Sequence, residues 1–296
     1  MASYKLWLDQ SRSNDTAKGF LRYALLFCEF TKKNPMDATA LDCARFFEHE
    51  RRRGLCDTSI QHVAKALKRF FRVIGRADLV ESMPQPRKST TYVAPWFTFG
   101  EFKRLIRACR TPFELALITA GYELALRQNE LCMLNKAELD TKKGLILVRR
   151  EKRAQQTPDL LPIRKEAFYG RPLDNLLNYL KTRRDRDPAM FVVSGGNLGN
   201  SVRRISKRTY SYHLEMLLSR AGLGGKGFSP HSLRHTRLTH MALEQMQKYG
   251  VTDIAVIAKF AGHVSTSTTL IYSHLAGEAL DGRNKKLQSV ARPPYC

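Results

Sequence analysis

The sequence Ser-Pro-His-Ser-Leu-Arg-His at residues 229–235 opens the most informative stretch of the chain. It is followed by Ala-Gly-His at residues 261–263 and by Thr-Thr-Leu-Ile-Tyr-Ser-His at residues 268–274. A serine followed by a proline is typical of a helix start, because the hydroxyl caps free N–H groups and proline fits the first helical turn. His231 and Arg234 then share one helix face, where an imidazole and a guanidinium together suit a phosphate group.

Each motif by itself also fits an ordinary structural role, in which the histidine caps a helix and the arginine pairs with a surface carboxylate. The combination is more specific, because a Gly-His pair at a helix boundary precedes Tyr272 within a helical run. The set resembles the C-terminal signature of the tyrosine recombinase (phage integrase) family, H-x-x-R, then G-H, then a nucleophilic tyrosine. The interval from Arg234 to His263 is longer than is usual in that family, and residues 245–250 are the expected insertion.

A second part of the family pattern lies at residues 125–131, Ala-Leu-Arg-Gln-Asn-Glu-Leu, which resemble the block G-L-R-x-x-E-L. The resemblance makes Arg127 the first catalytic arginine and gives Glu130 a supporting role, in which it orients nearby groups. Ala125 stands where the family usually has glycine, so we expect the turn before Arg127 to differ slightly. For the block alone, a structural Arg–Glu pair is the alternative.

A β-hairpin with a positively charged turn is also predicted. Residues 144–148, Gly-Leu-Ile-Leu-Val, and residues 160–163 have the apolar pattern of strands. In the family a lysine at this hairpin acts as general acid, and the resemblance points to Lys152. Which basic residue of the 149–153 turn is the general acid stays open, because further basic side chains crowd it. Three of them are expected to contact DNA, namely Arg149, Arg150 and Arg153.

The chain as a whole is basic and folded. Its 296 residues hold 50 Lys and Arg against 27 Asp and Glu, a formal net charge of +23, while 43% are hydrophobic. This apolar content excludes a disordered basic tail, so we expect a folded protein that binds a polyanion; a generally basic surface is the alternative. The cysteines form no C-x-x-C pair, and no apolar run is long enough to span a membrane. We therefore expect a cytoplasmic, nucleoid-associated protein without a metal site.

Two domains are expected. Residues 1–82 read as a compact helical domain, and residues 83–95 contain three prolines among basic and hydroxyl residues, as linkers do. Residues 96–296 would form the catalytic domain with a short C-terminal tail, starting with a helix over 98–109 that has a capping-box pattern. A nearly all-apolar, buried helix follows at 112–126. The expected fold is mainly α with a small β-hairpin or sheet, and the resemblance makes the first domain a DNA-clamping, core-binding domain and the second a mixed α+β catalytic domain.

Basic side chains are spaced to follow a phosphate backbone. In the first domain they include a triplet and a stripe of residues three or four apart on one helix face. In the second, residues 201–221 are basic at their start and apolar afterwards, which favours a helix lying in or along a DNA groove. A solvated helix face is the alternative. The expected DNA contacts are Arg51, Arg52, Arg53, Lys65, Lys68, Arg69, Arg72, Arg203, Arg204, Lys207 and Arg208.

The resemblance implies DNA cleavage without a metal or any other cofactor. Such a reaction needs cations at the phosphate, a nucleophile in line and a proton for the leaving oxygen. Arg127 and Arg234 would neutralise the phosphate charge. His231 would accept the tyrosine proton or bond the phosphate, and His263 would add a hydrogen-bond donor.

The other two members of the family's catalytic set act on the bond that breaks. Tyr272 would attack the phosphorus, and Lys152 would protonate the departing 5′ oxygen. The product is a 3′-phosphotyrosyl link, which keeps the bond energy so that a second 5′-hydroxyl can rejoin the strands.

Three functions compete. The first is a site-specific recombinase (integrase, resolvase or transposon-encoded) that acts on double-stranded DNA as a homotetramer, with a monomer compatible in free solution and accessory DNA-bending proteins as further partners. A type IB topoisomerase or telomere resolvase would use the same chemistry. The modest length disfavours both, as does the close resemblance of residues 268–274 to the recombinase family's pattern Thr-Thr-x-x-Tyr-x-His. An inactive, recombinase-derived DNA-binding protein would be expected to have lost part of the catalytic set, which is complete here.

Overall fold

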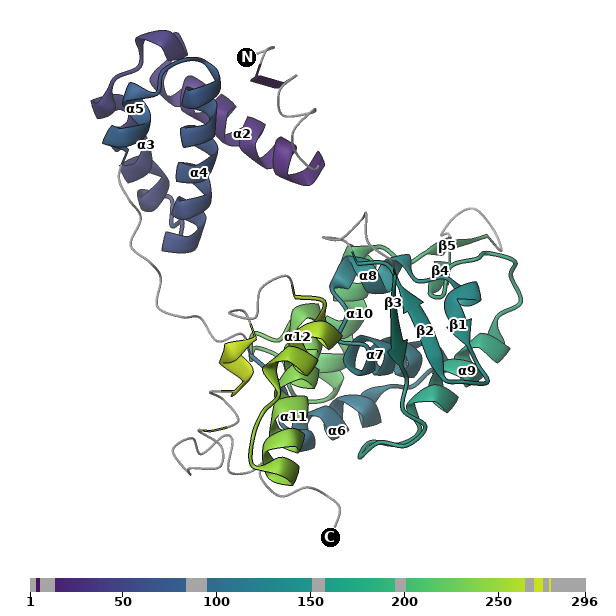
Figure 1. Ribbon diagram of the computed structural model, residues 1–296. Helices are drawn as coiled ribbons and strands as arrows, with labels where there is room; N and C mark the ends of the chain where they lie inside the picture. Colours follow the sequence, from purple (N-terminus) through teal and green to yellow (C-terminus); the bar gives the residue numbers. More distant parts are fainter. Residues whose placement is uncertain are drawn as a thin grey trace. The chain divides into compact units, whose positions relative to one another are not determined.

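The computed structural model describes residues 4–5, 14–83, 95–150, 158–194, 201–263, 269–273 and 277 (Figure 1). The chain divides into two compact units, Met1–Tyr92 and Val93–Cys296. Of the expected linker, residues 84–94 lie outside the described part. Within the described ranges, no helix is long and apolar enough to cross a membrane.

The first unit is helical. Its elements are α2 (Asn14–Thr31), the short 3-10 helix η1 (Pro35–Asp37), α3 (Ala40–Arg52), α4 (Asp57–Val73) and α5 (Asp78–Ser82). A capping box starts α3, since the Thr39 hydroxyl accepts the Asp42 N–H at 3.2 Å and the Asp42 carboxylate accepts the Thr39 N–H at 2.9 Å. The core is rich in aromatic rings, among them Phe27, Phe46, Phe47, Phe70 and Phe71.

The second unit combines helices with two small antiparallel sheets (Figure 1). Its helices are α6 (Phe99–Ala108), α7 (Pro112–Glu123), α8 (Gln128–Met133), α9 (Pro172–Thr182), α10 (Lys207–Arg220), α11 (Pro230–Tyr249), α12 (Ile254–Ala261) and the 3-10 helix η2 (Lys136–Glu138). One sheet has the order β1 (Leu139–Asp140), β2 (Leu145–Val148) and β3 (Asp159–Pro162), and the other pairs β4 (Val192–Ser194) with β5 (Val202–Arg204). The prediction of a mainly α fold with a small sheet is confirmed.

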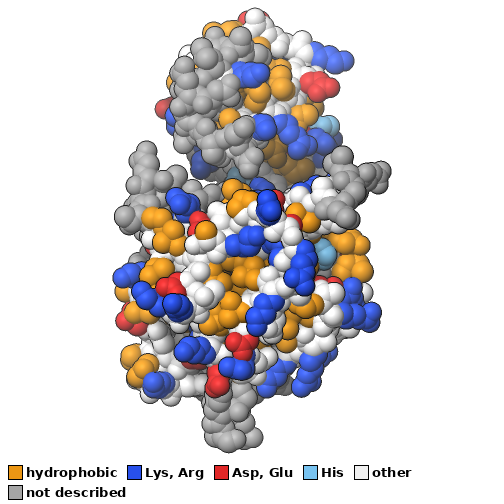
Figure 2. Space-filling model, turned by 90° about the vertical axis from the view of Figure 1, so that its right-hand side faces the viewer, with side chains coloured by type: hydrophobic (Ala, Val, Ile, Leu, Met, Phe, Trp, Pro, Cys, Tyr) orange, Lys and Arg blue, Asp and Glu red, His pale blue; other side chains and the backbone are white. Residues whose placement is uncertain are grey.

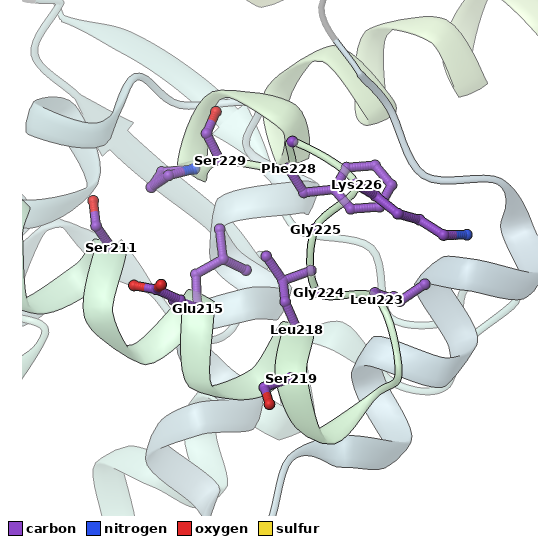
Figure 3. Close-up of a pocket in the computed structure, with 13 residues that line it drawn as sticks. Ser211, Glu215, Leu218, Ser219, Leu223, Gly224, Gly225, Lys226, Phe228 and Ser229 are labelled. Carbon is purple, nitrogen blue, oxygen red and sulfur yellow. The ribbon is translucent and has the colours of Figure 1, made fainter.

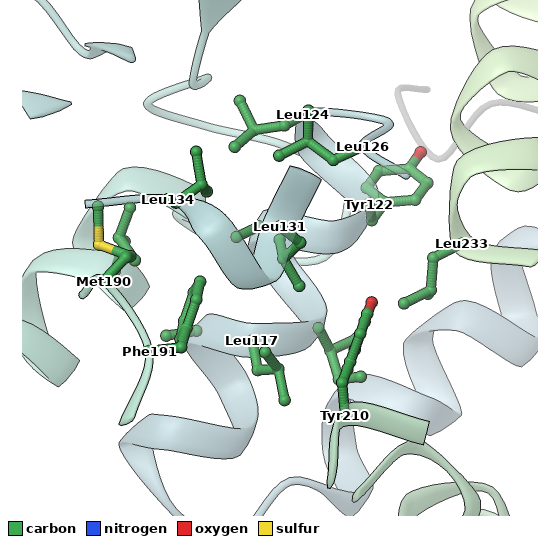
Figure 4. Close-up of a cluster of buried hydrophobic side chains, with 14 of the residues drawn as sticks. Leu117, Tyr122, Leu124, Leu126, Leu131, Leu134, Met190, Phe191, Tyr210 and Leu233 are labelled. Carbon is green, nitrogen blue, oxygen red and sulfur yellow. The ribbon is translucent and has the colours of Figure 1, made fainter. Parts of the chain in front are cut away.

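The buried helix α7 organises the core of this unit, because it packs against both α9 and α11. Figure 4 shows side chains from four helices meeting in one cluster, among them Leu117, Leu131, Tyr210 and Leu233. A Cβ atom at Gly121 in α7 would lie 2.6 Å from the Tyr210 hydroxyl and 3.2 Å from Leu233 Cδ1. The glycine therefore lets α10 and α11 approach α7 closely, and α11 carries the first site motif.

Two segments differ from the sequence-based expectation. The helix expected over 201–221 begins only at Lys207, because residues 202–204 pair with β4 in the register Val192↔Arg204. Ser206 caps the helix by accepting the Thr209 N–H at 3.1 Å. Residues 245–249 of the expected insertion continue α11 for more than a turn, and Gly250 ends the helix with a φ of 73°.

Candidate active site

Arg234 lies at the centre of the site, in the second turn of α11, and is 2% exposed. Its Nη1 donates to the Ala125 carbonyl at 2.6 Å, and its Nη2 donates to the Ala261 carbonyl at 2.8 Å. Burial lowers the pKa of Arg234 to about 10, and the positive charge of nearby Arg127 adds to the effect. The guanidinium is still charged at neutral pH, so the site holds a buried cation that ties α11 to the segments before α8 and at the end of α12.

The turn that presents the Ala125 carbonyl has a conformation that glycine favours. Ala125 has a φ of 45°, in the left-handed region, and its side chain is fully buried. An alanine in that region costs roughly 1 kcal/mol. Ala125, which stands where the family usually has glycine, therefore has a strained backbone conformation.

Glu130 holds two arginines together beneath the site. Its Oε1 accepts from Arg127 Nη1 at 2.7 Å and its Oε2 accepts from Arg150 Nη1 at 3.2 Å. The Arg127 backbone N–H also donates to Oε2, at 2.9 Å. Burial raises the pKa of Glu130, but these hydrogen bonds and the arginine charges outweigh burial and leave the pKa below its ordinary value. The carboxylate is therefore ionised and fixes the direction of Arg127.

Arg150, which we expected to contact DNA, points into the protein. Its side chain is 2% exposed, and Nε donates to Asp159 Oδ2 at 2.7 Å. Its Nη2 donates to the Phe260 carbonyl at 2.6 Å. With the Glu130 contact, this side chain joins β2, β3, α8 and the end of α12. Sequence reasoning missed this role because nothing in the run Arg149-Arg150 distinguishes the inward arginine from the outward one.

Tyr272 is buried, at 2% exposure, and its hydroxyl lies 2.7 Å from His235 Nδ1. Burial raises the pKa of Tyr272 to about 12, opposed by the charge of Arg234. Burial also lowers the pKa of His235 to about 4, with the charges of His231 and Arg234 adding to the effect. Both groups are therefore neutral at neutral pH. Sequence reasoning missed His235, although its place four residues after His231 on the same helix face is a usable signal.

The two histidines of the predicted set, His231 and His263, border this centre. His263 Nδ1 lies 2.8 Å from the Thr269 hydroxyl, and burial together with the Arg234 charge lowers the pKa of His263 to about 4. His231 is exposed in the first turn of α11, and its ring lies edge-on to His235 with the centroids 5.3 Å apart. Lys152 lies outside the described residues.

Comparison with known proteins shows which family this chain belongs to. Residues 95–278 match the sequence model of the phage integrase family. The chain belongs to the phage integrase family. This confirms the resemblance, and the protein is a tyrosine recombinase, an enzyme of the class that breaks and rejoins DNA strands.

Similar proteins and similar solved structures cover 91% or more of this chain. Tyrosine recombinase XerA of Thermococcus onnurineus (strain NA1) is 30% identical over 292 residues, which cover 98% of this chain and 94% of the relative. A lambda integrase (75–356) dimer bound to a COC′ core site has the same fold, with a TM-score of 0.71 at 14% identity over 91% of this chain and 92% of that one. A lambda integrase tetramer bound to a Holliday junction gives a TM-score of 0.70 at 15% identity, over 91% of this chain and 74% of that one.

Most of the basic residues expected to contact DNA lie at the surface of the recombinase, and Figure 2 shows Lys and Arg side chains spread over its visible face. Those that are exposed are Arg51, Arg52, Arg53, Lys65, Arg72, Arg149, Arg203, Lys207 and Arg208, while Lys68 and Arg69 are half-buried. Arg204 instead donates to the Cys132 and Leu134 carbonyls at 3.0 and 2.9 Å, which ties β5 to the end of α8. Arg153 lies outside the described residues.

A cavity of about 600 Å³ lies beside the start of α11, between α10 and the glycine-rich loop at residues 222–227 (Figure 3). Leu218 and Phe228 are apolar residues of its lining, and Glu215 and Lys226 are charged residues of its lining. None of the described catalytic candidates lines this cavity. It is therefore distinct from the Arg234–Tyr272 centre of the recombinase.

Proposed function

We propose that this protein is a site-specific recombinase that cleaves DNA with Tyr272 and rejoins it through a 3′-phosphotyrosyl intermediate. The observation that carries the proposal is a buried phenol that lies within electrostatic range of a buried, charged guanidinium. Tyr272 and Arg234 are each 2% exposed, and the Arg234 charge acts on the pKa of the phenol. A nucleophile beside a fixed cation in a site that excludes water is the arrangement that attack on an anionic phosphate needs.

The two arginines would stabilise the charge that builds on the phosphate oxygens in the transition state. Arg234 is held by two carbonyls and Arg127 by Glu130, so neither must reorganise during the reaction. Preorganised donors in a buried site contribute more than flexible ones in water. His263 would add a donor from the end of α12, and its contact with Thr269 fixes the ring.

Lys152 is our choice for the group that protonates the departing 5′ oxygen. Within the 149–153 turn, Arg149 pairs with Glu138 at 3.4 Å and Arg150 is buried in its own ion pairs. A lysine releases a proton far more readily than an arginine does. Each step then uses a side chain of the protein, and the proposal needs no metal and no other cofactor.

Double-stranded DNA is the proposed substrate and partner. The first unit would clamp the duplex with the basic residues of α3 and α4, and the second unit would hold the cleaved strand. A homotetramer on DNA is supported by the lambda integrase tetramer bound to a Holliday junction. Accessory DNA-bending proteins and a place on the nucleoid follow from such a role.

The test uses duplexes selected from a random-sequence pool by binding to the protein, then nicked beside candidate cleavage positions so that cleavage is trapped. The wild-type protein should form an SDS-resistant DNA adduct without added metal. Tyr272→Phe should bind the same duplex and form none. An adduct that persists in this variant would refute the assignment of Tyr272. Relaxation of supercoiled DNA without sequence preference would favour a topoisomerase, and binding without any adduct would favour an inactive DNA-binding protein.

A further inference from the structure

The nucleophile of the proposed reaction has an immediate partner that family resemblance did not point to. His235 Nδ1 lies 2.7 Å from the Tyr272 hydroxyl, and the two rings are tilted by 37° with centroids 5.9 Å apart. Tyr272 is 2% exposed, so bulk water has little access to the phenol. The hydrogen-bond partner of the hydroxyl, His235 Nδ1, is therefore placed to receive a proton that leaves the phenol during attack.

We propose that His235 accepts the Tyr272 hydroxyl proton during strand cleavage and returns it during rejoining. The inference rests on the proposed function, and it names the proton acceptor of that reaction. In cleavage, the O–H bond of Tyr272 breaks and an N–H bond forms at His235 Nδ1 while the phenolate oxygen bonds to phosphorus. The bond from phosphorus to the 5′ oxygen breaks, and that oxygen takes a proton from a separate acid. Rejoining reverses each of these steps.

Without DNA the proton stays on the tyrosine. The pKa of His235 is about 4 and that of Tyr272 about 12, both because of burial. An uncharged imidazole can accept the hydroxyl hydrogen bond but does not remove the proton from so weak an acid.

A bound phosphodiester changes this balance. An anion beside His235 favours the protonated imidazole and raises its pKa, since an opposite charge stabilises the charged form. As Tyr272 attacks, the phenolate charge moves onto the phosphate oxygens, where Arg234 and Arg127 compensate it. Proton transfer to His235 and bond formation to phosphorus thus support each other, and the substrate itself activates the nucleophile.

His231 is in a different position. It is exposed, and its ring lies edge-on to the His235 ring, with centroids 5.3 Å apart. With His235 as the proton acceptor, His231 would bond the phosphate, the other role that its place beside Arg234 allows.

The test compares His235→Ala and His235→Asn with the wild type in single-turnover adduct formation on nicked duplexes. The Asn amide can occupy the place of Nδ1 and keep a hydrogen bond to Tyr272, but it is not a base. We expect both variants to bind DNA as the wild type does and to form adduct at least ~100-fold more slowly, the usual effect of losing a positioned base. His213→Asn is the matched control, because His213 is half-buried, has a lowered pKa and lies on α10 against Phe113 and Tyr212.

A second measurement distinguishes proton transfer to His235 from a role of His235 in positioning Tyr272. A ring-fluorinated tyrosine at position 272 has a lower phenol pKa and needs less help from a base. With this tyrosine, the ratio between the adduct-formation rates of the wild type and of His235→Ala should become smaller. Adduct formation by His235→Asn at the wild-type rate would overturn the proposal, because it would show that residue 235 only positions Tyr272 by a hydrogen bond. An unchanged ratio with the fluorinated tyrosine, or a wild-type rate for His235→Ala, would also overturn it. Failure of the proposed function looks different, because the wild type itself would then form no adduct through Tyr272.

Discussion

A Cβ atom at Gly262 would lie 2.7 Å from Arg150 Nε, so the arginine occupies the space that any other residue at position 262 would need. Gly262 also has a φ of 65°, a backbone conformation that residues with a side chain rarely adopt. The neighbouring residues carry the site, since the Ala261 carbonyl binds Arg234 and His263 contacts Thr269. The glycine of the Gly-His motif therefore has a specific physical role, which is to let Arg150 reach the end of α12.

Gly262→Ala should be destabilising and should slow cleavage. The left-handed backbone costs an alanine roughly 1 kcal/mol, and displacing Arg150 from Glu130 and the Phe260 carbonyl adds to that cost. Urea unfolding and adduct formation measure the two effects. Gly250→Ala is the matched control, because Gly250 has a φ of 73° with nothing within 4 Å of the added Cβ. Equal losses of stability in the two variants would show that displacing Arg150 does not change the free energy of unfolding.

Arg150→Met should lower the free energy of unfolding by about 3 kcal/mol, because it leaves the buried carboxylate of Glu130 with one partner fewer. Cleavage should fall with it, since Glu130 fixes Arg127. The dependence of DNA affinity on salt should not change, because a buried side chain contacts no phosphate. A reduced salt slope would show that Arg150 does contact DNA. Arg149→Met is the control, because Arg149 is itself exposed and its long, 3.4 Å pair with Glu138 should be worth less than about 1 kcal/mol.

Local patterns in the sequence predicted the elements that depend on near neighbours. The capping box of α6 is present, with the Thr98 hydroxyl accepting the Glu101 N–H at 3.2 Å, and the hairpin forms with Leu145 opposite Pro162. The contacts that complete the site join distant residues, such as His235 with Tyr272 or Arg150 with the Phe260 carbonyl. No spacing rule reports a partner so far along the chain, and periodicity does not distinguish a buried arginine from an exposed one.

Stability should fall as the pH drops from about 6.5 towards 4, partly because of His235 and His263. Burial lowers the pKa of each to about 4, below the unfolded value of about 6.5. The unfolded chain therefore binds more protons in this range, and the stability present above pH 6.5 is lost on acidification. His235→Asn should flatten the fall by up to about 1.4 kcal/mol per pH unit, measured by urea unfolding at several pH values. A slope unchanged in this variant would contradict the neutral state of His235.

Arg234→Lys should bind DNA but cleave it at least ~100-fold more slowly, because an ammonium cannot span both the Ala125 and Ala261 carbonyls and still meet a phosphate. The residual rate should also become dependent on pH. Burial lowers the pKa of Arg234 to about 10, and the same burial would lower the pKa of a lysine below its ordinary value. The substituted lysine would lose its charge as the pH rises through that lowered pKa, so residual cleavage should decline towards alkaline pH, whereas the wild-type arginine keeps its charge to a higher pH. Arg220→Lys is the control, because Arg220 pairs with Glu114 at 2.8 Å and remains partly exposed on α10. Residual cleavage that rises with pH in Arg234→Lys would contradict a charge requirement at this position.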